Sequence, residues 1–444
     1  MSEQELKKFR KTLAGTGALP LEPNDPYYVS IFEDAPAKDP IARLLHNIME
    51  AESQSVNLLT GFRGNGKSTQ LKRLKQLLEN AGCHVVLVDM ADYVLMTRPP
   101  EISDFLLSLM AALAVKSKEA GYDKISMSYW ERLQAFMQNT QAKVDSLELG
   151  GDVAGLGARF TLQLKTEPTF KQQLQDALRG HVAGLVSGAG AFVAELVTAI
   201  REQTGDKNKK VVLLVDSVEQ IRGVGKEAQQ VHQNVENLFS GHAANLRFDL
   251  LHLVYTVPPY LIPLAPNVGQ KFGSDSITSW PNIHVRNQDE TADDNGLGVM
   301  RKIIEKRYPQ WQSIFSEAQL NRLATSSGGD VRDYFRLIRE CLLTLMLDTA
   351  SGARVSDAML VSAEAQLRSE LLPIAADDGR WLARISKTKD AALERTEELP
   401  RLARFLDSNL IMNYLNGAPW YDIHPLLVKE VAKYAAPDDT NPPP

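Results

Sequence analysis

Residues 61–68, Gly-Phe-Arg-Gly-Asn-Gly-Lys-Ser, have the spacing of a phosphate-binding loop. Glycines let the backbone wrap around phosphate oxygens, and the free N–H groups at the start of a following helix attract negative charge. Lys67 can reach the β- and γ-phosphates, and Ser68 can give an oxygen to Mg²⁺, which prefers hard oxygen ligands. The loop therefore predicts binding of ATP and Mg²⁺. The predicted nucleotide-binding residues are Gly61, Phe62, Arg63, Gly64, Asn65, Gly66, Lys67, Ser68 and Thr69.

The residues around this loop give it the right context. Ser55–Thr60 reads as a short apolar strand, and residues 68–79 read as a helix with leucines at helical spacing. A strand, a glycine loop and a helix in this order are what the motif requires. The alternative, a glycine-rich turn that binds no nucleotide, would not need these flanking elements.

A second signal is the apolar run Val211–Asp216, which ends in an acid. An acid at the carboxyl end of a strand beside the phosphate-loop strand can hold Mg²⁺. Glu219 follows one turn later and is the candidate general base for the attacking water, with Gln220 and Asp89 as alternatives. Without catalysis, Asp216 would only cap the end of a buried strand.

Thr256 ends another apolar run, which begins at Leu251. A small polar residue at this place can sense the γ-phosphate or align the attacking water. The alternative is a strand end that turns into the two prolines that follow.

The third signal is Ser-Gly-Gly-Asp-Val-Arg-Asp at residues 327–333, where Asp330 can cap a helix with Arg332 in its first turn. An arginine laid over the nucleotide by a helical domain would convert loss of the γ-phosphate into domain movement. The alternative is a solvated basic helix face. On a preceding helix, Arg301 and Arg307 could act in trans on a neighbouring copy.

These motifs resemble the AAA+/STAND group of P-loop ATPases and are most similar to its origin-recognition-type and signal-transducing branches. The resemblance covers about residues 40–350 and includes Val211–Glu219, Thr256 and Gly329–Arg332. It implies an ASCE-type sheet, a helical lid and an ATP-driven switch. Many relatives have a catalytic Glu directly after the Mg²⁺-binding Asp, but this chain has Ser217. That departure favours a slow switch over a motor.

Strands that alternate with helices predict an α/β fold, a P-loop NTPase parallel sheet with helices on both faces. The other predicted core strands are His84–Asp89 and, more weakly, Asn282–Val285, and a helix is predicted over Ile102–Glu119. The domains that we expect are an N-terminal arm at 1–40, an ATPase domain at 41–290 with an insertion at about 125–205, a helical lid at 291–352, a winged-helix-like domain at 353–436 and a disordered tail at 437–444.

Within the insertion, apolar and polar residues alternate at 160–164, which predicts a β-hairpin near 146–165, and Pro168 then falls in the first turn of a helix. The uncharged run 181–194 contains glycines four apart, a spacing that suits helix packing in lipid. It is shorter than the roughly 20 residues that a membrane span needs, and Glu195 interrupts it. We therefore expect a helix with a smooth packing face and no membrane.

Near the C-terminus, Asn416-Gly417 separates two β-prone runs, which predicts a hairpin. Helices followed by a hairpin resemble a winged helix. DNA binding is an option through the cation-rich stretch 380–404 and the hairpin, and docking of a partner protein fits the local charge balance equally well. Trp420 and Tyr421 are expected in the core rather than stacked on bases.

Bulk composition narrows the function classes. The net charge of −6 argues against a protein that coats nucleic acid by bulk charge. Cys83 and Cys341 lack the spacing of a zinc or disulfide framework, so a reducing cytoplasm is expected. The acidic start lacks the features of a secretion signal.

Together the sequence predicts a slowly hydrolysing ATP switch that couples nucleotide state to oligomer or partner-protein contacts, with sensing or defence signalling suggested by family analogy. One alternative is a DNA-binding initiator or loader ATPase that uses the C-terminal winged helix. Another is a nucleotide-bound scaffold that does not hydrolyse ATP. A small-molecule or nucleotide kinase fits less well, because of the chain's size and its C-terminal module.

Overall fold

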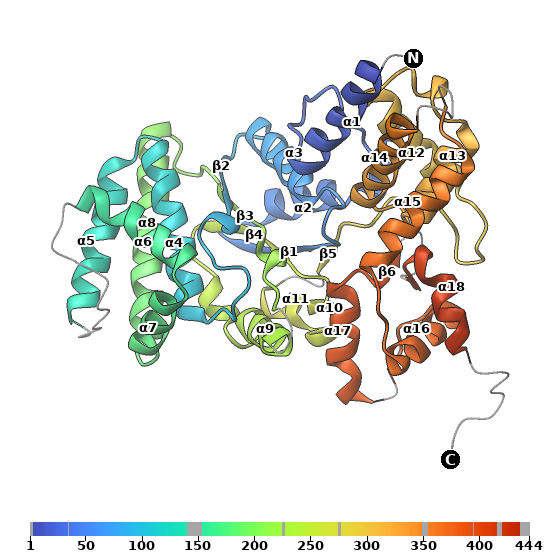
Figure 1. Ribbon diagram of the computed structural model, residues 1–444. Helices are drawn as coiled ribbons and strands as arrows, with labels where there is room; N and C mark the ends of the chain where they lie inside the picture. The colour runs from blue at the N-terminus through green and yellow to red at the C-terminus, as the bar shows by residue number, and fades with distance from the viewer. Residues whose placement is uncertain are drawn as a thin grey trace. The chain divides into compact units, whose positions relative to one another are not determined.

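The computed structural model describes residues 3–33, 35–139, 153–223, 227–273, 277–348, 354–393, 395–414 and 420–435. The chain forms two compact units (Figure 1). The sheet unit comprises Asp39–Thr60 and Gln70–Ser279, and the helical unit comprises Met1–Lys38, Gly61–Thr69 and Trp280–Pro444. The phosphate loop therefore groups with the residues that follow Trp280, and the domain limits given above remain a prediction.

The sheet unit is built on five parallel strands in the order β2-β3-β4-β1-β5, which confirms the α/β prediction. The strands are β1 (Ser55–Thr60), β2 (His84–Asp89), β3 (Val211–Asp216), β4 (Leu251–Val257) and β5 (Thr278–Ser279). Every residue of β3 and β4 is buried. A parallel sheet covered on both faces has no solvated side, so its central strands are apolar throughout.

The strand order corrects one expectation. We predicted the acid-bearing strand beside the phosphate-loop strand, but β4 lies between β3 and β1. Because all the strands are parallel, β1, β4 and β3 end at the same edge of the sheet, with Thr60, Val257 and Asp216 as their last residues.

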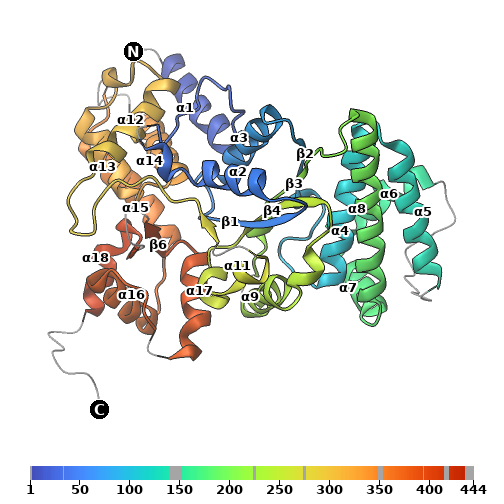
Figure 2. The ribbon, with the colours of Figure 1, turned by 180° about the vertical axis from the view of Figure 1, so that it is seen from behind.

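Helices cover both faces of the sheet. In both views α2 lies on one face, while α9 and α11 lie on the other (Figures 1 and 2). A second group, α4 to α8, forms a helical bundle next to β2. The helices are α2 (Pro40–Glu50), α3 (Lys67–Asn80, which begins in the helical unit), α4 (Ile102–Glu119), α5 (Asp123–Asn139), α6 (Val153–Thr166), α7 (Pro168–Leu178), α8 (Val182–Thr204), α9 (Ala228–Glu236), α10 (Leu261–Leu264) and α11 (Val268–Lys271).

The hairpin predicted near 146–165 is wrong where the structure describes the chain. Residues 160–164 lie in the helix α6, with Phe160 and Leu164 buried one turn apart and Leu162 between them 60% exposed. Positions i, i+2 and i+4 fit a strand by alternation, but i and i+4 also share one helix face. Leu147–Leu149, the other half of the predicted hairpin, lie outside the described residues.

The glycine-rich run belongs to α8. This helix is long and apolar enough to cross a membrane by length and composition alone. Its large apolar side chains, however, are buried, including Leu185, Phe192 and Leu196. They face α4 and α5, and Phe192 packs against Tyr129 with ring centroids 4.6 Å apart. Its apolar residues therefore contribute to the core of the helical bundle.

The helical unit has its own hydrophobic core. Its members come mainly from α1, α12, α13, α14 and α15. These elements, with the C-terminal ones, are α1 (Glu3–Ala18), α12 (Asp294–Arg307), α13 (Glu317–Ser326), α14 (Val331–Leu347), α15 (Asp357–Glu370), α16 (Ala376–Thr388), α17 (Leu399–Asp407), β6 (Ile411–Tyr414), β7 (Trp420–Ile423) and α18 (Val428–Val431).

Two expectations for this unit need correction. The N-terminal arm contains α1, whose Leu6, Phe9 and Leu13 are buried at helical spacing against α14. The prolines of this segment, which interrupt regular structure, all follow the helix, at positions 20, 23, 26, 36 and 40. Residues 282–285, a predicted weak strand, form no strand, because the Ile283 N–H donates to the Gly329 carbonyl and the Val285 carbonyl accepts from Asp293 N–H.

The predicted C-terminal hairpin is confirmed. β6 and β7 pair antiparallel, with Tyr414 opposite Trp420. The two rings stack with centroids 4.5 Å apart, and Trp420 is buried as expected. Tyr421, also expected in the core, is only partly buried. The connecting residues 415–419 lie outside the described chain. With α16 and α17 before it, this hairpin matches the helices-then-hairpin order of a winged helix.

Candidate functional site

The phosphate loop follows β1 directly and leads into α3 at Lys67. Gly64 and Gly66 have φ values of 94° and 92°, a region that residues with a Cβ rarely adopt. These two glycines let the loop curl so that it ends at the first turn of α3. The first N–H groups of a helix have no partner within the helix and favour an anion there.

The Lys67 side chain runs back along the inside of the loop and is only 3% exposed. Its Nζ donates to the carbonyls of Gly61 and Phe62 at 2.8 and 2.7 Å. The ammonium group is thus held within the loop, and its phosphate-binding role stays a prediction. Three N–H donors on one flexible stem can exchange a carbonyl for a phosphate oxygen at little cost.

Trp280, which the sequence analysis did not single out, holds the phosphate loop through two hydrogen bonds to Asn65. Asn65 Nδ2 donates to the Trp280 carbonyl at 2.8 Å, and Trp280 Nε1 donates to the Asn65 carbonyl at 2.9 Å. Trp280 is buried and meets Phe32 edge to face. The pairing spans 215 positions, so no local pattern could reveal it.

Arg332 is the predicted residue that the structure brings to the loop. A Cβ built on Gly64 would lie 2.8 Å from the Cβ and the Nε of Arg332. The Arg332 side chain therefore lies beside the phosphate loop at Gly64, and a larger residue at position 64 would have to displace it.

Close packing explains the two glycines, Gly328 and Gly329, that precede Arg332. Gly329 has a φ of 77°, and a Cβ there would lie 1.7 Å from the Ile283 carbonyl oxygen. A Cβ on Gly328 would meet Met412 Sδ at 2.3 Å. The two glycines let the chain turn tightly between the segment 282–285 and the C-terminal hairpin, and α14 begins immediately afterwards.

Asp330 caps α14 as predicted, accepting a hydrogen bond from the Asp333 N–H at 2.9 Å. Its carboxyl group is fully enclosed. Burial, followed by the nearby charge of Asp333, raises the pKa of Asp330 to about 7. His424 and Arg336 hold the pKa of Asp333 below its usual value, against the opposing effect of burial. The helix that carries Arg332 therefore starts on a titratable group.

The N-terminal segment also touches the start of α3. Leu21 N–H donates to Thr69 Oγ1 at 3.0 Å, the two residues being 48 positions apart. Thr69 was predicted to contact nucleotide, and in the structure its hydroxyl accepts from the backbone of this segment.

In the sheet unit, Asp216 ends β3 and is buried, and its Oδ1 accepts from the Ser217 N–H at 2.8 Å. Ser217 has a φ of 68°, so the chain turns sharply after the acid. Thr256 Oγ1 accepts from the Val218 N–H at 3.1 Å and thereby ties the end of β4 to this turn. Thr256 thus has a structural task, and its role as a γ-phosphate sensor remains a prediction.

The candidates for a general base lie nearby in the same unit. Glu219 sits in the short 3₁₀ turn after Ser217 and is partly buried. Gln220 Nε2 donates to Ser217 Oγ at 2.9 Å. Asp89 is the register partner of Asp216 on β2, but it is exposed and accepts from the Ala91 N–H. The roles of all three stay predictions.

The two arginines considered for action in trans differ. Arg307 is buried, donates to the carbonyls of Tyr27 and Ile303, and lies over the Phe335 ring; burial lowers its pKa to about 10. It is committed to its own unit. Arg301 donates to Asn321 at 2.7 Å and pairs with Glu317 at 3.3 Å, and it is partly exposed.

Across the described residues, no cluster of three or more His, Cys, Asp or Glu could hold a metal ion. The predicted ligands of Mg²⁺ are the Ser68 hydroxyl and the Asp216 carboxylate. Each offers the hard oxygen donor that Mg²⁺ prefers. Ser68 belongs to the helical unit and Asp216 to the sheet unit, so their joint role as ligands stays a prediction.

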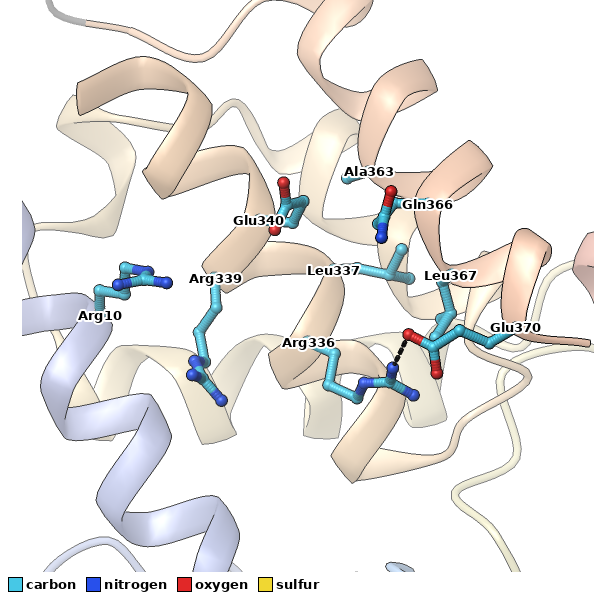
Figure 3. Close-up of a pocket in the computed structure, with 9 residues that line it drawn as sticks. All are labelled: Arg10, Arg336, Leu337, Arg339, Glu340, Ala363, Gln366, Leu367 and Glu370. Atoms are coloured by element: carbon cyan, nitrogen blue, oxygen red, sulfur yellow. Dashed lines mark hydrogen bonds and ion pairs between the residues drawn. The ribbon is translucent and has the colours of Figure 1, made fainter. Parts of the chain in front are cut away.

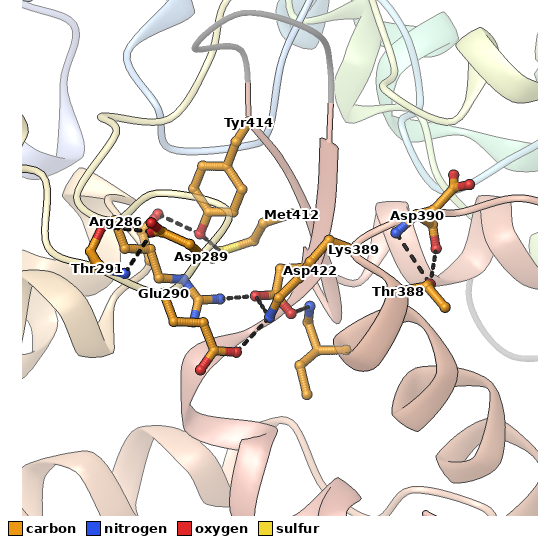
Figure 4. Close-up of polar contacts among 12 residues, drawn as sticks. Arg286, Asp289, Glu290, Thr291, Thr388, Lys389, Asp390, Met412, Tyr414 and Asp422 are labelled. Atoms are coloured by element: carbon orange, nitrogen blue, oxygen red, sulfur yellow. Dashed lines mark hydrogen bonds and ion pairs between the residues drawn. The ribbon is translucent and has the colours of Figure 1, made fainter.

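Ion pairs occupy most of the cations in the predicted DNA-binding stretch. Arg380 pairs with Asp377, and both Arg401 and Arg404 pair with Asp378. Lys389 bridges Asp422 and Glu290 at 2.8 and 2.9 Å, and Asp422 also takes Arg286 (Figure 4).

The other cations of the stretch 380–404 are Arg384, Lys387 and Arg395. Arg384 lies over the Trp381 ring and donates to the Ala392 carbonyl. Lys387 and Arg395 are exposed. The stretch is thus cationic in sequence but largely neutralised in the fold.

A scan against models of protein families finds no match, and a search of curated proteins finds none either. Among solved structures, the chain is similar to the ORC2 protein of Aeropyrum pernix in its ADPNP-ADP complexes, at 11% identity with a TM-score of 0.39, covering 96% of this chain and 97% of that one.

Two other similar structures are a Walker-type ATPase of Pyrococcus abyssi and Cdc6p of Pyrobaculum aerophilum. The first has 13% identity and a TM-score of 0.40, covering 94% of this chain and 99% of the other. The second has 12% identity and a TM-score of 0.39, covering 96% and 97%.

Proposed function

We propose that this chain is an ATP-binding switch ATPase in which the phosphate loop holds the triphosphate and Arg332 reports its γ-phosphate. The observation that carries the proposal is the position of the Arg332 side chain beside Gly64, where an added Cβ would meet it. A phosphate bound on the loop amides would lie next to a guanidinium group, which pairs with phosphate in a bidentate way. Loss of the γ-phosphate would remove a partner of Arg332 and free the start of α14 to move.

The proposed chemistry is the attack of water on the γ-phosphorus, giving ADP and inorganic phosphate. Loop amides and Lys67 would stabilise the charge on the phosphate oxygens. When bound, Mg²⁺ neutralises charge on the β- and γ-phosphates. Ser68 and Asp216 are the residues proposed to hold it, and Glu219 is the proposed base. With Ser217 after the acid, we propose slow turnover, which suits a switch.

The biological setting that we favour is an initiator-type ATPase rather than a sensor in signalling. The described chain has helices and a hairpin in winged-helix order after the helical core. Because the cations of 380–404 are mostly paired, DNA contact would have to use other groups as well, such as backbone N–H groups and the exposed Lys387 and Arg395.

Phosphate release from ATP tests the proposal. We expect slow, Mg²⁺-dependent turnover in the wild type and a loss of at least about tenfold in Asp216→Asn, because the metal would lose its protein carboxylate. Asp89→Asn is the matched control, since Asp89 is the register partner of Asp216. An equal loss of turnover in Asp216→Asn and Asp89→Asn would contradict the special role of Asp216. No turnover in the wild type would favour the alternative of a nucleotide-bound scaffold that does not hydrolyse ATP.

DNA binding is tested separately with a short duplex at increasing salt. An initiator should bind at low salt, and its affinity should fall steeply as salt rises, because phosphate contacts release counterions. No binding at about 50 mM salt would remove the initiator setting while leaving the ATP switch intact.

A further inference from the structure

Three helices of the helical unit enclose a small basic pocket that none of the motifs uses. Its volume is about 200 Å³. Arg10 of α1 lines it, as do Arg336, Leu337, Arg339 and Glu340 of α14 and Ala363, Gln366, Leu367 and Glu370 of α15. The α15 residues are spaced three and four apart and so share one face of that helix.

Two of the three arginines in this pocket lack acidic partners. Arg336 is held by Asp333 at 3.1 Å and by Glu370. In the part of the chain that the structure describes, Arg10 and Arg339 make no ion pair, and the buried Nε of each has no hydrogen-bond acceptor. A buried N–H of a charged group without an acceptor is costly.

The two carboxylates that line the pocket, Glu340 and Glu370, form no ion pair with Arg10 or Arg339 among the described residues. Figure 3 shows Arg10 and Arg339 at one end of the pocket and the Arg336–Glu370 pair at the other. The Glu340 carboxylate points away from Arg339. Two arginines with unsatisfied Nε–H groups therefore line the same pocket, and an anion bound there would supply the missing acceptors.

We propose that this pocket binds a phosphate group, with Arg10 and Arg339 as its main donors. Arginine forks match tetrahedral oxyanions, and the Gln366 amide lines the same pocket as a further donor. The pocket is smaller than the ~300–1,000 Å³ of sites that enclose whole drug-sized ligands. A single phosphate group fits this size, either free or as part of a nucleic-acid backbone. The site lies on α14 beyond Arg332 and is distinct from the phosphate loop.

The test uses the full chain with Lys67→Ala, so that the phosphate loop contributes little to phosphate binding. Inorganic phosphate is titrated by calorimetry in this background, alone and combined with Arg10→Gln or Arg339→Gln. We expect each replacement to weaken phosphate binding by about tenfold, as the loss of one charge-assisted pair implies. Arg354→Gln, an exposed arginine that donates to a backbone carbonyl, is the control and should change nothing.

A second arm identifies the source of the phosphate. The same variants are titrated with a short duplex DNA. Weaker binding of both probes supports the site with a nucleic-acid backbone as ligand, and weaker binding of phosphate alone supports it with a free phosphate. Arg10→Lys and Arg339→Lys guard against misfolding, because they keep the charge and should retain part of the affinity.

Several results would overturn the proposal. The proposal fails if neither phosphate nor DNA binds to the Lys67→Ala protein. It also fails if Arg10→Gln and Arg339→Gln leave the binding of both probes unchanged. Tighter binding of a glutamate-rich peptide than of phosphate at the same arginines would show a carboxylate site instead. None of these results bears on ATP binding at the phosphate loop.

Discussion

The Arg332 side chain lies beside Gly64: a Cβ built on the glycine would lie 2.8 Å from both the Cβ and the Nε of the arginine. The two residues are far apart in sequence, one in the phosphate loop and the other in the first turn of α14. Their contact links the loop that would hold a triphosphate to the helix that begins at Asp330.

The first prediction concerns this contact. Gly64→Ala adds a methyl group where the φ is 94° and Arg332 is in the way, so we expect ATP affinity to fall by about tenfold or more through strain of ~1–2 kcal/mol and displacement of the arginine. Gly82→Ala is the matched control. Gly82 has a similar φ of 88° with no atom within 4 Å, so this change should cost stability without changing ATP affinity. Similar ATP affinity in the two variants would contradict the prediction.

The second prediction concerns discrimination between nucleotides. Arg332→Ala should weaken ATP binding by about tenfold, the value of one charge-assisted hydrogen bond, and leave ADP binding nearly unchanged. Arg332→Lys should recover only part of the effect, because an ammonium group lacks the guanidinium fork. Equilibrium titration with both nucleotides measures the ratio, and an equal loss for ATP and ADP would argue against γ-phosphate reading.

The third prediction follows from the raised pKa of Asp330. An acid whose pKa rises from 3.8 in the unfolded chain to about 7 in the fold keeps its proton longer when folded. Its stabilising contribution is therefore complete below about pH 4 and is lost as the pH rises through 7. The lowered pKa of Asp333 acts in the opposite sense and only below its ordinary value of 3.8.

Asp330→Asn isolates this effect, because asparagine is also a good helix cap but does not ionise. Between pH 5 and pH 8, the wild type should lose stability relative to the variant. Thermal unfolding of both proteins at the two pH values measures this. A wild-type-minus-variant difference that is the same at pH 5 and pH 8 would show that Asp330 does not titrate in this range.

The fourth prediction concerns the buried charges at the C-terminal hairpin. Asp422 is 1% exposed and takes both Arg286 and Lys389 (Figure 4). Asp422→Asn leaves two cations without their shared partner, and we expect a loss of ~3–5 kcal/mol in the free energy of unfolding. Asp377→Asn removes an exposed partner of Arg380 and should cost at most ~1 kcal/mol. Denaturant unfolding that gives equal losses would argue against the buried network.

The local parts of the fold were predictable from the sequence, and the reason is physical. β2 and β3 each contain an unbroken run of four or five apolar residues, and β1 is apolar at Val56, Leu58 and Leu59. The phosphate loop is set by glycines whose φ values only they adopt easily. The cap of α14 by Asp330 depends on neighbours three residues apart. Each of these features is decided within a few positions of the chain.

Other features depend on tertiary contacts and could not be read in this way. The exchange of hydrogen bonds between Asn65 and Trp280 spans 215 positions. The place of β4 between β1 and β3 is a matter of strand order, which apolar runs do not encode. At Phe160 and Leu164 the pattern fits two periods, and only the exposure of Leu162 in the fold decides for a helix.

Equilibrium titration with ATP and Mg²⁺ tests the central claim most directly. One ATP should bind per wild-type chain, and Lys67→Ala should weaken binding by about a hundredfold, since it removes a charge held inside the loop. Lys75→Ala, on the same helix in an exposed pair with Glu79, should bind like the wild type. Wild-type affinity in the Lys67→Ala protein, or no ATP binding by the wild type, would contradict the account.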